Sequence, residues 1–180
     1  MDLTAKFRIS PFEPTDDDVA HLREQLSLVE GEESDALLGR MFRRGVSAAE
    51  EYCNRVYRES AWRLEFAGSG DAVFLPLFPV SVVSSAVADG VELDADGFRL
   101  VPAAGGWCVR LSAPVRESLT LTVTAGYDAE AVPDWFEASV QMIAADLYEH
   151  REAQNDTSLT ENRLLKFCLE PHRFFYGGVV

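Results

Sequence analysis

The chain has 180 residues, 47% of them hydrophobic and 26% charged, and its 16 basic against 30 acidic residues give a net charge of −14. This size and composition are typical of one globular domain. The acidic excess excludes a protein that grips DNA or RNA, because that requires clustered Lys and Arg against phosphates. No apolar run approaches the roughly 18 residues of a membrane span. Because its start shows no secretory signal, the chain is expected to stay in the cytoplasm of the cell that makes it.

The negative charge is spread along the whole sequence, and no segment is basic. One interpretation is solubility alone, which needs nothing more than a net charge far from zero. A second is a surface that lies near nucleic acid without adhering to it. The charge does not separate these two interpretations.

The sequence opens with an arm and a helix. Pro11 and Pro14 disfavour helix before them, so residues 1–14 are expected to be extended or loose. Thr15, followed by three aspartates, is typical of a capped helix start. Apolar spacing then continues to Gly31, which predicts the end of this helix.

A second helix is predicted from Ser34 to about Arg58, because apolar and small residues recur at three- and four-residue spacing. Gly45 is small enough to let another backbone approach this helix closely. The two helices together predict an N-terminal helical hairpin over residues 15–58.

The second helix also carries the only basic cluster, Arg40, Arg43 and Arg44. Pairing with acids of a neighbouring helix or subunit is the favoured interpretation. A phosphate contact is the alternative, although three arginines in an acidic surround make a weak patch.

Residues 60–125 change to period-two patterns interrupted by turns, which predicts a central antiparallel sheet. We expect a hairpin between its first two strands, a tight turn at Asp89-Gly90 and a break at Ala113-Pro114. The short strands are predicted at 61–66, 73–76, 81–88, 91–93, 98–101, 107–111 and 119–124.

The last strand leads directly to a long amphipathic helix that Val132-Pro133 opens, and a short helix follows around Leu164 and Cys168. The fold class predicted is therefore α+β, with the sheet held in one helical frame. We expect a single domain over 1–180. Its parts are an arm (1–14), a helical hairpin (15–58), a β-rich insertion (60–125), C-terminal helices (132–169) and a tail (170–180).

The tail places three aromatic residues, Phe174, Phe175 and Tyr176, before two glycines. Such a segment either folds back onto the core or docks on a partner. Docking is the favoured interpretation, because Gly177-Gly178 offers no packing and aromatic residues are favoured interface anchors.

The sequence contains no recognisable catalytic or metal-binding motif. None of the three histidines has a second ligand at metal spacing, and the three separated cysteines fit inert core thiols. Asp146, Glu149 and His150 share one helix face and would permit acid–base chemistry. A solvated helix face explains them better. We therefore predict no catalytic residue, no cofactor and no metal.

Taken in order, the motifs resemble the head–tail connector, or adaptor, family of tailed bacteriophages and the related gene transfer agents. The resemblance spans nearly the whole chain and is most specific in the order of its last motifs. The segments that carry it are Ala61-Trp62-Arg63-Leu64, Leu75 to Val83, Asp89-Gly90, Thr124 to Tyr127, Val132-Pro133, Leu147 to Glu152, Leu164-Leu165 and Pro171 to Arg173.

The resemblance implies a structural virion protein that is not an enzyme. Such proteins form a ring, dodecameric in the family, below the portal through which DNA is packaged and ejected, and they later receive a tail-completion (stopper) protein. It implies that Phe174, Phe175 and Tyr176 contact the portal, and it is compatible with Arg40, Arg43 and Arg44 contacting the next subunit. The free protein is expected to be monomeric.

Three alternatives stay open beside the connector. The first is a tail-terminator or other neck protein. The second is a small enzyme that uses carboxylates near Asp146, Glu149 and His150. The third is an acidic decoy of nucleic-acid-binding proteins, which the charge permits but which would not need this sheet.

Overall fold

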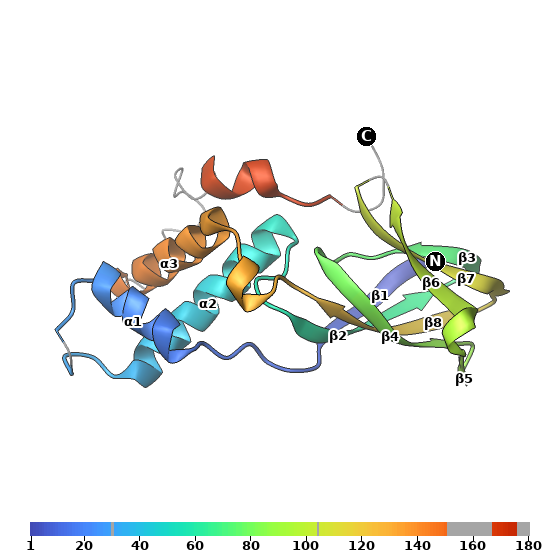
Figure 1. Cartoon of the computed structure of the whole chain (residues 1–180), viewed down its shortest axis with the longest axis horizontal. Helices are drawn as coiled ribbons and strands as arrows, with labels where there is room; N and C mark the ends of the chain where they lie inside the picture. Colours follow the sequence, from blue (N-terminus) through green and yellow to red (C-terminus); the bar gives the residue numbers. More distant parts are fainter. Residues whose placement is uncertain (30, 104, 151–166, 176–180) are drawn as a thin grey trace. The chain divides into compact units, whose positions relative to one another are not determined.

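A computed structural model describes residues 1–29, 31–103, 105–150 and 167–175. The chain divides into two compact units (Figure 1). The β unit comprises Met1–Pro11, Asn54–Glu130 and Phe174–Val180, and the helical unit comprises Phe12–Cys53 and Ala131–Arg173. Helix and strand content are both substantial and the sheets are antiparallel, so the α+β prediction is confirmed.

The helical unit is built from α1 (Asp16–Gln25), α2 (Asp35–Cys53) and α3 (Asp134–Glu149), followed by helical residues 167–169 and the short η4 (Glu170–His172). α2 packs against both α1 and α3 (Figure 1). The apolar stripe of α3 faces inward, because Phe136, Val140 and Ile143 are all buried. No helix in the described part of the chain is long and apolar enough to cross a bilayer.

The predicted helix start at Thr15 is a complete capping box. Thr15 Oγ1 accepts a hydrogen bond from the Asp18 N–H at 3.2 Å, and Asp18 Oδ2 accepts one from the Thr15 N–H at 2.7 Å. These bonds satisfy two backbone donors that helix geometry leaves without partners. The Asp18 side chain is buried, so this cap is part of the packed unit.

Both N-terminal helices end earlier than their apolar spacing predicted. α1 ends at Gln25 rather than near Gly31, because Ser27 takes a left-handed conformation with φ of 53°. α2 ends at Cys53 rather than near Arg58, and Asn54 has a φ of 54°. Asparagine tolerates this conformation well and commonly follows the last helical turn. The apolar spacing continues past the last residue of each helix, so it overestimated the length of both helices.

The β unit holds two antiparallel sheets where one was expected. The larger sheet has the order β1-β2-β8-β4-β5 and the smaller one β3-β7-β6. One hydrophobic core contains buried side chains from both sheets, among them Leu64, Val109 and Leu121. The strands are β1 (Asp2–Arg8), β2 (Ser60–Ala67), β3 (Gly70–Phe74), β4 (Val80–Ala88), β5 (Val91–Glu92), β6 (Phe98–Ala103), β7 (Gly106–Val115) and β8 (Ser118–Ala125).

Strand pairing corrects two local predictions. β2 does not form a hairpin with β3; it pairs with β1 and β8, while β3 pairs with β7. Part of the arm that was expected to be extended or loose is thus an ordered edge strand. Pro114 does not end β7, because it lies between Arg110 and Val115 where the register with β3 is irregular. Its missing N–H therefore removes no regular ladder bond.

Candidate interaction surfaces

The C-terminal segment is anchored in the helical unit by four consecutive contacts. Leu169 is 3% exposed. The hydroxyl of Tyr52 donates a hydrogen bond to the Glu170 carboxylate, and this bond raises the pKa of Tyr52 above its usual value. His172 stacks on Trp135 with ring centroids 4.0 Å apart and ring planes 8° from parallel. The guanidinium of Arg173 lies over the Tyr52 ring.

The next residue, Phe174, is anchored within the β unit. It is 7% exposed, and its ring centroid lies 5.2 Å from that of Phe78. Asn54 Nδ2 donates a hydrogen bond to the Phe174 carbonyl at 3.0 Å. A Cβ on Gly106 would lie 2.5 Å from the Phe174 ring, so only glycine leaves room for it. Phe174 is therefore folded back onto the chain.

Phe175 differs from its neighbour, because it is 68% exposed. The third predicted portal contact, Tyr176, lies outside the described residues. The sequence did not reveal which ring of the pair is buried. The one sequence feature related to the burial of Phe174 is the Gly105-Gly106 turn, which is distant in sequence. Its glycines indicate a turn, but the sequence does not indicate that Phe174 packs on it.

The basic cluster lies on the exposed face of α2. Arg43 Nη2 forms an ion pair with Glu13 Oε2 at 2.7 Å. Glu13 belongs to the non-helical segment before α1 of the same chain, so this pair does not test the predicted contact with a neighbouring helix or subunit. Arg40 and Arg44 are exposed, and neither forms an ion pair with another described residue.

The carboxylates and histidine at the end of α3 form an ordinary helix-surface pair. His150 Nδ1 lies 3.3 Å from Asp146 Oδ1, one helical turn earlier, and the His150 side chain is 64% exposed. Glu149 is also exposed. Contacts at this spacing are a general feature of helices, so the geometry gives no specific support to acid–base chemistry.

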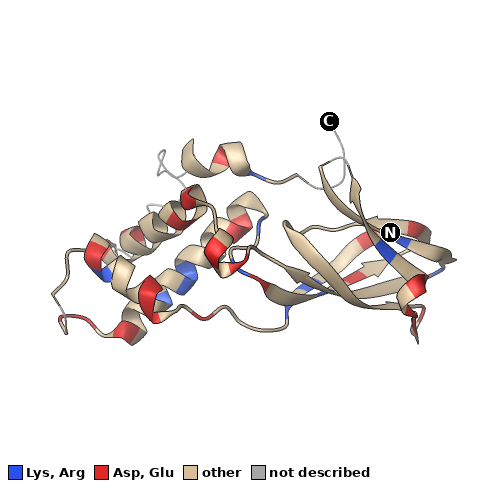
Figure 2. Ribbon diagram, viewed as in Figure 1, with Lys and Arg blue, Asp and Glu red and all other residues tan. Residues whose placement is uncertain are grey.

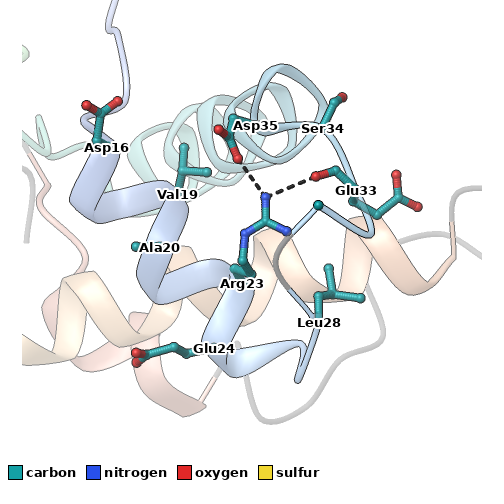
Figure 3. Close-up of a pocket in the computed structure, with 10 residues that line it drawn as sticks. Asp16, Val19, Ala20, Arg23, Glu24, Leu28, Glu33, Ser34 and Asp35 are labelled. Atoms are coloured by element: carbon teal, nitrogen blue, oxygen red, sulfur yellow. Dashed lines mark hydrogen bonds and ion pairs between the residues drawn. The ribbon is translucent and has the colours of Figure 1, made fainter.

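A cavity of about 850 Å³ opens between α1 and the loop that leads to α2 (Figure 3). Arg23 reaches across it and is held there by protein groups. Its Nη2 contacts Asp35 Oδ1 at 2.6 Å and the Glu33 carbonyl at 3.0 Å (Figure 3). The guanidinium group of Arg23 therefore links α1 to the loop before α2. Among the described residues, no group of His, Cys, Asp and Glu has the arrangement of a metal site.

Charge divides unequally between the two units. The helical unit contains 19 acidic and 8 basic residues, a net −11, whereas the β unit contains 11 acidic and 8 basic residues, a net −3. Figure 2 shows that both signs occur on the helices as well as on the strands, with acidic positions at both ends of α1 and basic positions along α2. The acidic excess of the chain therefore lies mainly in the segments that form the helical unit.

No protein-family model matches the sequence, and no match was found among curated proteins. Solved structures do match. A chain from the neck of an empty gene transfer agent particle, computed with C6 symmetry, superposes with a TM-score of 0.75 at 23% identity, covering 98% of each chain. A chain from the virion of a native gene transfer agent particle gives 0.74 at 23%, again over 98% of each. One from the native neck, computed with C12 symmetry, gives 0.74 at 22% with the same coverage.

These matches confirm the predicted resemblance at the level of the fold. The chain has, over essentially its full length, the α+β fold found in the neck of gene transfer agent particles.

Proposed function

We propose that this chain is a structural neck protein, a head–tail connector or adaptor that forms a ring below the portal and joins head to tail. The observation that carries the proposal is the match to neck chains over 98% of both lengths. Full-length agreement supports a shared place in the particle more strongly than one shared motif would, although fold alone does not define function. The site of action would be the neck of a virion or virion-like particle, assembled in the bacterial cytoplasm.

The charge supports passage of DNA through such a ring. A helical unit with a net charge of −11 repels the phosphate backbone, so DNA would slide past without a binding site. This arrangement also needs no cofactor and no turnover. It favours the second interpretation of the acidic sequence, a surface close to nucleic acid that does not adhere to it.

The tail is proposed as the contact with the portal. Leu169 and Phe174 are buried, so they fix the start of the tail on the chain itself. The exposed ring of Phe175, and Tyr176 after it, would then reach the portal. Phe174 would not touch the portal itself, but its buried ring would orient the two residues that follow it.

Arg40, Arg43 and Arg44 are proposed as contacts between subunits of the ring. Arg40 and Arg44 are exposed, while Arg43 is tied to Glu13 in the same chain. Reversing all three charges should prevent rings from forming, as seen by electron microscopy. Intact rings from the reversed variant would remove this cluster from the interface.

Portal capture tests the proposal directly. Immobilised portal protein should retain the full chain, and deleting residues 175–180 or substituting Phe175→Ala should reduce retention at least tenfold. Phe167→Ala is the matched control, because Phe167 is 79% exposed but precedes the anchored segment. It should be retained like the unmodified chain.

Two results would revise the proposal in different ways. Undiminished retention of the truncated chain would show that the tail assignment is wrong, while the connector role would stand. Retention by a tail protein and not by the portal would favour the alternative, a tail-terminator or other neck protein. A connector should bind the portal first and the tail-completion protein afterwards.

A further inference from the structure

Two arginines lie side by side on the smaller sheet. Arg99 of β6 and Arg110 of β7 are direct Cα partners, and Ala72 of β3 is the next partner along the same row. Directly opposite residues of an antiparallel pair project from the same face of the sheet. Both arginines are exposed. Two guanidinium groups therefore leave the sheet together, in a chain with a net charge of −14.

No contact in the described part of the β unit explains this pair. Like charges directly opposite each other destabilise a sheet, so the pair is a cost to folding. Neither arginine forms an ion pair with a described residue, and this includes Asp71, which lies beside Ala72 on the edge strand. Leu100 and Val109, the neighbours in sequence, point to the core. The arginines thus lie on the face opposite to this core, where Cys108 in the next row is 5% exposed.

The adjacent row of the same face is apolar. Phe74, Cys108 and Val101 are register partners across the three strands, and Phe74 is 46% exposed. The face therefore combines an aromatic ring with two arginines. Aromatic residues and arginine are the residue types most enriched in protein interfaces and in their energetic centres. We call these residues, Phe74, Arg99 and Arg110, the arginine face.

We propose that the arginine face binds the acidic helical unit of a second copy of this chain. The inference rests on the proposed function, in which copies form a ring. The matched necks were computed with C6 and C12 symmetry, and in a cyclic ring each contact joins two different surfaces. The chain carries two surfaces of complementary charge. One is the basic arginine face, and the other is the helical unit, which has a net charge of −11.

Exposed acids on α1 are suitable partners for the arginine face. Asp16, Asp17 and Glu24 are exposed. Asp17 and Glu24 are seven residues apart and so share one side of the helix. Arg–carboxylate pairs give both strength and orientation. The contact would also relieve the repulsion between the two arginines, which the isolated chain retains.

Zero-length cross-linking of the full chain assembled on the portal protein tests the proposal. The substitutions R99K and R110K keep both charges and supply amines that a carbodiimide joins to contacting carboxylates. The background is low, because the sequence has only two lysines, Lys6 and Lys166. Mixing isotope-labelled and unlabelled copies separates cross-links between copies from those within one copy. We expect cross-links between copies that join both substituted positions to acids of the helical unit.

Charge reversal provides the second readout. R99E together with R110E should reduce ring formation at least tenfold while capture of single copies by the portal persists. Adding Asp16→Lys, Asp17→Lys and Glu24→Lys to that variant should restore rings, because both surfaces are then reversed. Substituting Arg63→Glu and Arg116→Glu, two arginines away from this face, is the control and should leave rings intact.

Several results would overturn the inference. Rings whose cross-links avoid the helical unit, or rings unaffected by R99E with R110E, would leave the connector role standing without this contact. Cross-links to the portal only would assign the arginine face to the portal. Binding of duplex DNA by the unmodified chain that is abolished in R99E with R110E, with rings intact, would assign the arginine face to DNA. Failure of the unmodified chain to reach the portal would refute the proposed function, and this inference with it.

Discussion

Gly126 makes the change of direction after β8 possible. Its φ is 126°, and its N–H donates a hydrogen bond to the Pro79 carbonyl at 2.9 Å. A Cβ at this position would lie 2.3 Å from the carbonyl carbon of Arg58, which is backbone and cannot move aside cheaply. Both the conformation and the space therefore require glycine.

Gly126→Ala should destabilise the protein by on the order of 3 kcal/mol or more, from strain and backbone overlap together. Chemical denaturation measures this change. Gly90→Ala is the matched control, because Gly90 has a φ of 80° but nothing within 4 Å of its Cβ position. The control should lose only about 1 kcal/mol. Equal losses would show that the overlap with Arg58 is unimportant.

The side chain of Asp89 links the turn between β4 and β5 to the turn between β7 and β8. Its carboxylate accepts backbone hydrogen bonds from Arg116 at 2.9 Å, Glu117 at 2.8 Å and Ser118 at 3.0 Å. These bonds, with the Ser118 N–H as the largest cause, lower the pKa of Asp89 below its ordinary value of 3.8. The sequence predicted only the tight turn with Gly90. The three distant donors could not be predicted because they belong to the turn between β7 and β8.

The lowered pKa of Asp89 predicts a pH-dependent contribution to stability. A carboxylate whose folded pKa is depressed stabilises the fold above its unfolded pKa, and this contribution is lost as the pH falls through the folded pKa. The unfolding free energy of the unmodified chain should thus exceed that of Asp89→Asn at pH 6. The difference should shrink steadily below about pH 4. A difference that stays constant from pH 6 to pH 2 would contradict this assignment.

The packing of α2 on α3 depends on the small residue that the sequence placed at Gly45. A Cβ there would lie 2.8 Å from the Val140 carbonyl and 3.2 Å from the Ala144 nitrogen. The backbones of the two helices consequently approach each other closely at this point. The prediction that Gly45 admits another backbone is confirmed.

Gly45→Ala should cost about 1–3 kcal/mol by forcing α2 and α3 apart. Gly39→Ala is the control in the same helix, since its nearest neighbours lie 3.9 Å and 4.0 Å from the added Cβ. There the higher helix propensity of alanine should be neutral or stabilising by up to about 1 kcal/mol. Thermal unfolding of both variants measures the contrast, and a stabilised Gly45→Ala variant would refute the close approach.

Elements whose signals are local were predicted well from the sequence. The capping box at Thr15, the turn at Asp89-Gly90 and the start of α3 after Pro133 each have signals in residues that are neighbours in the chain. Periodicity also located most strands to within a few residues. Such features require only propensity, capping and turn geometry.

Elements whose partners are distant in sequence could not be predicted. β1 pairs with β2 across about fifty intervening residues, and β3 pairs with β7 instead of its neighbour β2. Period-two patterning shows which face of a strand is buried but not which strand lies beside it. The same limit applied to the tail, where burial of Phe174 on Gly106 depends on a contact across sixty-eight residues.

At the scale of the whole molecule, the division of charge is the feature most relevant to function. The chain should show no measurable binding to duplex DNA at 50 mM or 150 mM salt. Its net charge is −14, of which the helical unit contributes −11, so phosphate groups are repelled. Fluorescence anisotropy of a labelled duplex measures this. Binding that weakens steeply as the salt concentration rises would contradict the proposal that DNA passes without being bound. It would indicate that basic side chains contact the phosphates.

The central claim is that this chain is a structural component of the neck. Electron cryomicroscopy of particles that carry a tagged copy of the chain tests it most directly. The account predicts a closed ring of tag density between the portal and the tail. Tag density elsewhere in the particle, or particles with complete necks that lack the chain, would contradict it.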